Sequence, residues 1–146
     1  MNRIVFINGS YVKEENAKIS IFDRGLLFSD AVYEVTAVID NKLVDFPSHV
    51  KRLNQSLNKL KIDYKFNEKT LLEIHKNLLN KNPFNNNEGL IYLQVSRGSA
   101  ERDFLIKTNS LSPNIFAFTQ EKILTDLTQG LKIITKEDLR WQRRDI

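Results

Sequence analysis

Arginine is the residue type whose placement in this sequence most clearly suggests chemistry, because a guanidinium group binds phosphate or carboxylate through two hydrogen bonds at once. Arg52 lies three residues after His49 in a segment with helical periodicity, so the two side chains share one side of the expected helix. A glycine-containing loop carries Arg97 and Arg102, and the segment 140–146 contains three more arginines. These positions suit an anionic ligand, but each one alone is also typical of a basic side chain that extends into water.

A tyrosine and a glutamate are adjacent in the segment 31–39, which is rich in β-branched residues and therefore predicts a strand. The alternation of side chains along a strand places Tyr33 and Val35 on one face and Glu34 on the other. Tyr33 is thus a polar group on an apolar face. By itself this pattern favours a core tyrosine with a satisfied hydroxyl group, and it leaves an active-site tyrosine open.

The composition excludes several other kinds of site. The 146 residues contain no cysteine, so disulfide bonds and thiol chemistry are ruled out. Two histidines, His49 and His75, are too few for a zinc site, and we expect no metal. A net charge of +4 without a basic and aromatic stripe does not indicate a nucleic-acid partner. No apolar run is long enough to span a membrane and no signal peptide is recognisable, so we expect a cytoplasmic protein.

The remaining segments predict the elements that must position these groups. Asn8-Gly9 favours a tight turn between two short strands. Residues 22–30 are expected to form a loop with an apolar anchor. Alternation and β-branched residues predict strands over residues 4–7, 11–12, 18–21, 31–39, 43–46, 90–96, 115–119 and 130–135.

Two helices are predicted between these strands, with Ser48 and Asn67 as their candidate N-caps. Apolar residues recur at helical spacing in each: Val50, Leu53, Leu57 and Leu60 in the first, and Leu71, Ile74, Leu78 and Leu79 in the second. The order of elements predicts an α+β domain over residues 1–120. Residues 121–146 are expected to form a linker and the first strand of a second, incomplete domain.

Four segments, in this order along the chain, closely resemble the fold type IV, pyridoxal-phosphate-dependent aminotransferases, and within them the D-amino-acid (D-alanine) transaminase branch. They are Asp23-Arg24-Gly25 with Phe28-Ser29-Asp30-Ala31-Val32-Tyr33-Glu34-Val35, His49-Val50-Lys51-Arg52-Leu53, Tyr92-Leu93-Gln94-Val95-Ser96-Arg97-Gly98, and Asp138-Leu139-Arg140-Trp141-Gln142-Arg143-Arg144-Asp145-Ile146. The resemblance implies the small N-terminal domain of this fold, followed by the first strand of the cofactor domain. It also implies a homodimer that binds pyridoxal 5'-phosphate. The lysine that forms the Schiff base with this cofactor would follow Ile146, at position 147.

The resemblance assigns roles to individual residues. Arg52 matches the arginine that binds the cofactor phosphate, and His49 and Glu34 match members of a polar network around it. Tyr33 matches the active-site tyrosine near the Schiff base and the substrate, and Val35, on the same face, would shape the side-chain pocket.

By the same resemblance, Arg102 matches the loop arginine that holds the substrate α-carboxylate from the neighbouring subunit. The D-amino-acid branch usually carries a histidine two residues later, where this chain has Phe104. Arg97 is expected to support the loop.

The activity that the resemblance implies is transamination between a D-amino acid of the D-alanine type and a 2-oxo acid such as 2-oxoglutarate. Arg102 favours this branch, whereas Phe104 keeps two alternatives open, a branched-chain L-amino-acid aminotransferase and an aminodeoxychorismate lyase. A truncated, non-catalytic dimerisation domain is the alternative from another functional class.

Overall fold

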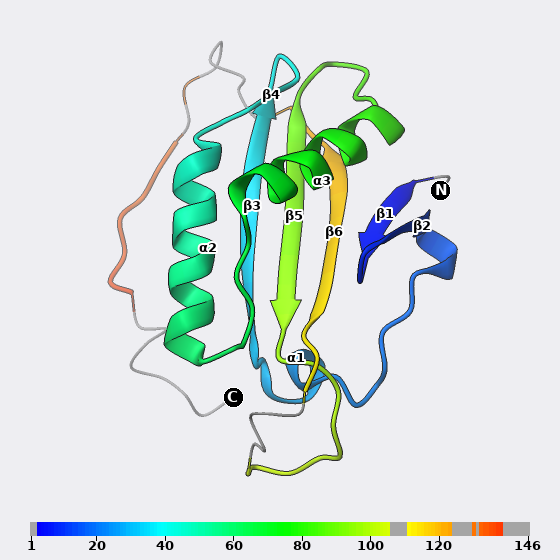
Figure 1. The fold of residues 1–146 in the computed structure, drawn as a ribbon. Coiled ribbons are helices and arrows are strands. Elements are labelled where there is room, and N and C mark those ends of the chain that lie inside the picture. Colours follow the sequence, from blue (N-terminus) through cyan, green and yellow to red (C-terminus); the bar gives the residue numbers. More distant parts are fainter. Residues whose placement is uncertain (1–2, 106–110, 124–129, 131, 139–146) are drawn as a thin grey trace.

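The computed structural model describes residues 3–105, 111–123, 130 and 132–138. These residues form a six-stranded antiparallel sheet with two long helices on one face (Figure 1). The strand order across the sheet is β2-β1-β6-β5-β3-β4. The bounds of the strands are β1 Ile4–Ile7, β2 Ser10–Lys13, β3 Ala31–Ile39, β4 Lys42–Leu43, β5 Gly89–Ser96 and β6 Asn114–Glu121. The predicted α+β class is therefore confirmed.

The helices are α2 (Phe46–Leu60) and α3 (Glu68–Lys81), and each buries the apolar stripe that its sequence predicts. The stripe of α2 contacts β3, and that of α3 contacts β1 and β6. Leu60, at the end of α2, is the predicted core position that stays exposed. The core therefore lies between the helices and one face of the sheet.

The central strand β3 shows the predicted alternation, and the helices decide which of its faces is buried. Glu34, Thr36 and Val38 point towards the helices and are buried. Tyr33 is 64% exposed and Val35 is 38% exposed on the opposite face. The interpretation of Tyr33 as a core residue is wrong, because no helix of the described chain covers its side of the sheet.

Two local signals are confirmed, and one is wrong. Asn8 and Gly9 both have positive φ, as the tight turn between β1 and β2 requires. Asn67 caps α3 by accepting a hydrogen bond from the amide of Lys69. Ser48, however, is not the cap of α2, which already begins at Phe46. Pro47 explains the earlier start, since the fixed φ of proline suits the first turn of a helix.

Several predicted elements differ from the structure where pairing partners are lacking. Residues 18–21 form no strand, and the strand expected over 43–46 is the two-residue β4. The described residues of 130–135, expected to be the first strand of a cofactor domain, have no regular structure. A strand requires a neighbouring strand for its hydrogen bonds. Residues 18–21 and the described residues of 130–135 pair with no strand of the described sheet, whereas Lys42 and Leu43 pair with β3.

The segment 22–30, expected to be a loop, contains the short helix α1 (Arg24–Phe28). Its N-cap is Asp23, whose side chain accepts a hydrogen bond from the amide of Gly25. Glu14–Asn16 form an additional 3-10 turn, η1. None of the described helices is long and apolar enough to cross a membrane.

Candidate functional site

Glu34 is the centre of a polar cluster between β3 and α2. Its carboxylate is buried, and it accepts hydrogen bonds from Nε and Nη2 of Arg52, each at 2.7 Å. Nδ1 of His49 lies 2.7 Å from the same carboxylate. Because His49 and Arg52 are three residues apart on α2, both side chains reach β3 from one face of the helix. The structure thus brings together three residues that the sequence resemblance assigns to one network.

The protonation states of this cluster follow from its hydrogen bonds. Burial raises the pKa of Glu34, but the hydrogen bonds and charges of Arg52 and His49 outweigh burial and leave that pKa lowered. An ionised carboxylate only accepts hydrogen bonds, so Nδ1 of His49 must donate to it. Nδ1 then has no lone pair for Nη2 of Arg52, 3.2 Å away. The two donors share one carboxylate oxygen, and among the described residues no hydrogen bond is made to Nε2 of His49.

Arg52 is fixed and accessible at the same time. The hydrogen bonds to Glu34 raise the pKa of the guanidinium group, which stays charged. Two of its nitrogens are oriented by Glu34, yet 64% of the side chain is exposed. A guanidinium group held in this way is preorganised for a second anion at its exposed side.

Tyr33 begins an aromatic row on the opposite face of the sheet. Its ring stacks on Tyr92 of β5, with the ring centroids 5.6 Å apart and an angle of 13° between the ring planes. Tyr92 continues the row to Phe116 and Phe118 of β6, at centroid distances of 6.1 and 5.2 Å. No local sequence pattern indicates this row, because it is built from three strands that are distant along the chain.

The two faces of β3 meet at an edge of the sheet. Strand β4 pairs with β3 only at Val38 and Ile39, so the outer edge of β3 from Ala31 to Thr36 has no strand partner in the described part of the chain. Tyr33 and Val35 lie on one side of this edge, and Glu34 with its partners lies on the other. A single ligand at the edge can therefore contact residues of both faces.

Arg102 lies outside this cluster, in the loop that follows β5. Its Cζ atom is 5.2 Å from the ring centroid of Phe28 and 5.3 Å from that of Phe104. No contact among the described residues joins Arg102 to Arg52 or Tyr33. The structure does not bring all predicted site residues of one chain together, and the loop arginine forms a separate group.

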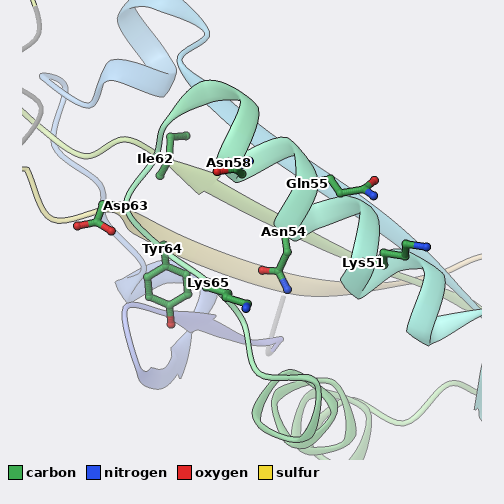
Figure 2. Close-up of a pocket in the computed structure, with 8 residues that line it drawn as sticks. All are labelled: Lys51, Asn54, Gln55, Asn58, Ile62, Asp63, Tyr64 and Lys65. Carbon is green, nitrogen blue, oxygen red and sulfur yellow. The ribbon is translucent and has the colours of Figure 1, made fainter.

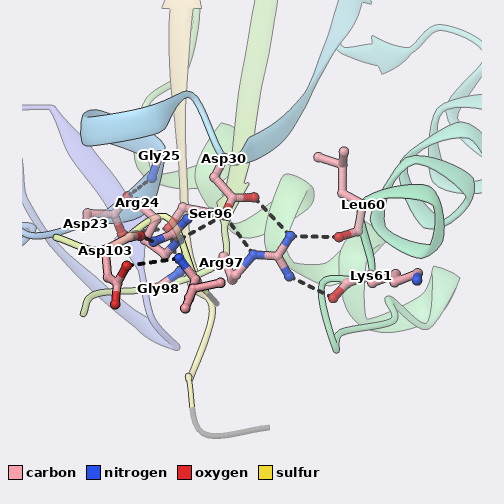
Figure 3. A network of polar contacts seen from close by, with 11 residues as sticks. Asp23, Arg24, Gly25, Asp30, Leu60, Lys61, Ser96, Arg97, Gly98 and Asp103 are labelled. Atoms are coloured by element: carbon pink, nitrogen blue, oxygen red, sulfur yellow. Dashed lines mark hydrogen bonds and ion pairs between the residues drawn. The ribbon is translucent and has the colours of Figure 1, made fainter. Parts of the chain in front are cut away.

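A second ionic network anchors the base of this loop (Figure 3). Asp30 accepts hydrogen bonds from Nε and Nη2 of Arg97, at 2.7 and 3.0 Å, and from Nε of Arg24, at 3.0 Å. Arg97 also donates to the carbonyl oxygens of Leu60 and Lys61, at the end of α2. Burial raises the pKa of Asp30, but its hydrogen bonds to the two arginines leave that pKa lowered. Arg97 is buried and supports the loop base, as predicted.

The cavity shown in Figure 2 lies elsewhere, beside α2 and the segment that follows it. Its volume is about 830 Å³. Asn54 points towards the cavity, but both polar atoms of its amide are hydrogen-bonded to the backbone of Phe66. The lining contains none of the predicted site residues: Lys51, Asn54, Gln55, Asn58, Ile62, Asp63, Tyr64 and Lys65. We therefore assign the candidate site to the Glu34 cluster and the edge of β3 rather than to this cavity.

Known proteins match nearly the whole chain. The family model for amino-transferase class IV matches residues 31–145. The D-alanine aminotransferase of Staphylococcus epidermidis is 40% identical over 144 residues, which are 97% of this chain and 50% of that protein. The D-alanine aminotransferase of Bacillus licheniformis is 34% identical over the same shares of both chains. The chain spans about half the length of the curated relatives it matches.

Solved structures share the fold at low sequence identity. The branched-chain amino acid aminotransferase of Escherichia coli has a TM-score of 0.74 at 17% identity, covering 84% of this chain and 40% of that one. The T.th. branched-chain enzyme, complexed with N-(5'-phosphopyridoxyl)-L-glutamate, has a TM-score of 0.73 at 20% identity, covering 84% and 41%. These neighbours confirm the predicted fold, that of the small N-terminal domain of fold type IV aminotransferases.

Proposed function

Because the chain belongs to the amino-transferase class IV family, we propose that the protein transfers amino groups between a D-amino acid of the D-alanine type and a 2-oxo acid such as 2-oxoglutarate. Enzymes of this family depend on pyridoxal 5'-phosphate. The curated relatives at 34–40% identity support the D-amino acid as substrate. The observation that carries the proposal is the fixed but exposed guanidinium group of Arg52 beside the edge of β3.

The residues of the Glu34 cluster fit the phosphate of the cofactor. Arg52 would hold it, because a planar guanidinium group matches two oxygens of a dianion. Glu34 fixes the orientation of Arg52, and His49 donates to Glu34 through Nδ1. When bound, pyridoxal 5'-phosphate supplies an electron sink for the negative charge that develops at the substrate Cα atom. By the resemblance, the lysine that attaches it covalently would be residue 147.

The exposed face of the sheet would receive the substrate. The Tyr33 hydroxyl group would donate or accept a hydrogen bond near the reacting atoms, and Val35 would bound the side-chain pocket. Arg102 would bind the α-carboxylate from the neighbouring subunit, so the proposal includes a homodimer, in the cytoplasm. The described contacts of Arg102 with aromatic rings leave its charge available for such a carboxylate.

Phe104 supports a second candidate function, transamination of branched-chain L-amino acids. The histidine usual in the D-amino-acid branch can donate a hydrogen bond to a carboxylate, and a phenylalanine cannot. Full-length protein supplied with pyridoxal 5'-phosphate should convert 2-oxoglutarate to glutamate with D-alanine and not with L-leucine. Conversion with L-leucine alone would replace the first proposal by the second.

A non-catalytic dimerisation domain is tested by mass rather than by activity. The chain of 146 residues has a mass of 17.0 kDa. We expect the native protein to be much heavier and to have the yellow absorbance of a lysine-bound cofactor, which borohydride removes. A colourless native protein with the mass of the 146 residues alone would support the non-catalytic alternative.

A further inference from the structure

Phe28, the last residue of α1, has a ring that contacts the side chains of Arg102, Arg24 and Phe104. Its ring centroid is 5.2 Å from Cζ of Arg102, 4.6 Å from Cζ of Arg24 and 5.7 Å from the ring centroid of Phe104. Arg24 is buried and compensated by Asp30, whereas Arg102 is exposed and forms no ion pair with any residue that the structure describes. Phe28 thus contacts one arginine that is paired with a carboxylate and one that forms no ion pair with a described residue.

The backbone of the loop is held close to Phe28 by the adjacent arginine. Arg24 donates from its amide to the carbonyl oxygen of Gly98 at 2.9 Å, and from Nη1 to the carbonyl oxygen of Asp103 at 2.8 Å (Figure 3). Asp103 directly follows Arg102 in the chain. At Gly98, φ is +108°, and an added Cβ would collide with the carbonyl oxygen of Ser112. The start and the middle of the loop are therefore fixed, which leaves the orientation of the Arg102 side chain to the rings around it.

We propose that Phe28 is a positioning residue that orients the guanidinium group of Arg102 for a carboxylate. The inference rests on the proposed function and deepens it. A guanidinium group over an aromatic ring is attracted by the ring face, while its N–H groups remain directed outwards in their own plane. A phenyl ring has no polar atom to compete for those N–H groups. Phe104, where the D-amino-acid branch usually carries a histidine, adds a second ring contact to Arg102.

The test compares full-length, cofactor-loaded variants by steady-state kinetics with D-alanine. Phe28→Leu should raise KM for the amino acid by roughly 2- to 30-fold, the range expected for one cation–π contact. It should leave kcat and the cofactor affinity close to the wild-type values. Phe28→Tyr, which keeps an aromatic ring at this position, should have the wild-type KM. Phe22→Leu is the matched control, because Phe22 belongs to the same segment and has no ring contact with an arginine in the described chain.

A second background separates positioning from a general structural role. If Phe28 acts through Arg102, Phe28→Leu should add nothing to the KM of an Arg102→Met variant. The inhibition constant of propionate, which has the carboxylate but no amine, should rise with KM in the single variant. If Phe28→Leu destabilises the fold, Phe104→Leu is the variant to use instead. It removes the other ring contact of Arg102, at a residue that is 78% exposed.

The outcomes distinguish the inference from the function on which it rests. An equal rise in KM in both backgrounds, or an unchanged KM in Phe28→Leu and Phe104→Leu, would overturn the positioning role and leave the transaminase proposal intact. A wild-type protein that transaminates neither D- nor L-amino acids would overturn both.

Discussion

Glu34 on β3 and Arg52 on α2 are joined by two parallel hydrogen bonds, each 2.7 Å long. Glu34 is buried and Arg52 is mainly exposed, so the pair connects the core to the surface. The buried partner fixes the orientation of the accessible one. This arrangement predicts that the proposed cofactor site is sensitive to a residue that the cofactor would not touch.

Replacing the carboxylate of Glu34 tests this dependence. Glu34→Gln keeps the shape but places an amide donor against an Arg52 donor, so Arg52 should lose its fixed orientation. Charge-assisted hydrogen bonds contribute about 1.5–3 kcal/mol, so the affinity for pyridoxal 5'-phosphate should fall roughly 10- to 100-fold. Cofactor absorbance titrations measure this. Glu73→Gln, an exposed residue of α3, is the control. An unchanged affinity would show that Glu34 does not contribute to cofactor binding.

The planar shape of the Arg52 side chain is tested by a substitution that keeps its charge. Arg52→Lys replaces five N–H donors in a fork by one ammonium group, which cannot bind Glu34 and a phosphate in the same plane. We expect at least about a tenfold loss of cofactor affinity. The melting temperature should change little because the side chain is 64% exposed. A lysine variant with full cofactor affinity would show that charge alone is sufficient.

The buried histidine of α3 predicts a pH dependence of stability. Burial lowers the pKa of His75 to about 4, although its Nδ1 is hydrogen-bonded to the carbonyl oxygen of Leu71. As the pH falls, His75 therefore becomes protonated near pH 6.5 in the unfolded chain, but only near pH 4 in the folded chain. Stability should be complete above pH 6.5 and fall by up to about 3 kcal/mol between pH 6.5 and 4.

The contribution of His75 is isolated by His75→Leu. The free energy of unfolding of this variant, measured in urea from pH 4.5 to 7.5, should depend less on pH than that of the wild type. Equal slopes for the two proteins would assign the acid sensitivity to other groups.

Asp30 compensates two buried arginines, and its removal should be costly. Asp30→Asn leaves the guanidinium groups of Arg24 and Arg97 without their shared anion, which predicts a loss of about 3–5 kcal/mol in the free energy of unfolding. Asp63→Asn, at an exposed position, serves as the control. A loss below about 1 kcal/mol, the level of a surface ion pair, would contradict the assignment.

The wild-type Asp30 also predicts an acid transition. Its pKa is lowered in the folded state, so its stabilising effect is present above its unfolded value of 3.8 and decreases as the pH falls below that value. The Asp30→Asn variant should lack this transition in thermal unfolding measured from pH 5 to 2.5. A variant that keeps it would show that another carboxylate is responsible.

Local patterns were sufficient where neighbouring residues alone set the conformation. The Asn8-Gly9 turn, the Asn67 cap and the alternation along β3 depend on φ preferences, on a side chain two residues away and on the pleat of a strand. The five residues of α1 gave no comparable signal, because a single helical turn is unstable without tertiary contacts. Asp23 caps α1 and is itself held by Ser96 and Asn114, which are distant in sequence.

The sequence by itself determined the family, the order of the main elements and the opposite orientation of Tyr33 and Glu34, because motif spacing and strand periodicity are properties of consecutive residues. Only the tertiary structure decided which of these two faces is buried, since that depends on where α2 and α3 pack. The contacts of Arg102 with Phe28, and of Arg97 with the end of α2, were decided in the same way. They join residues far apart along the chain, and no periodicity in the sequence encodes such distances.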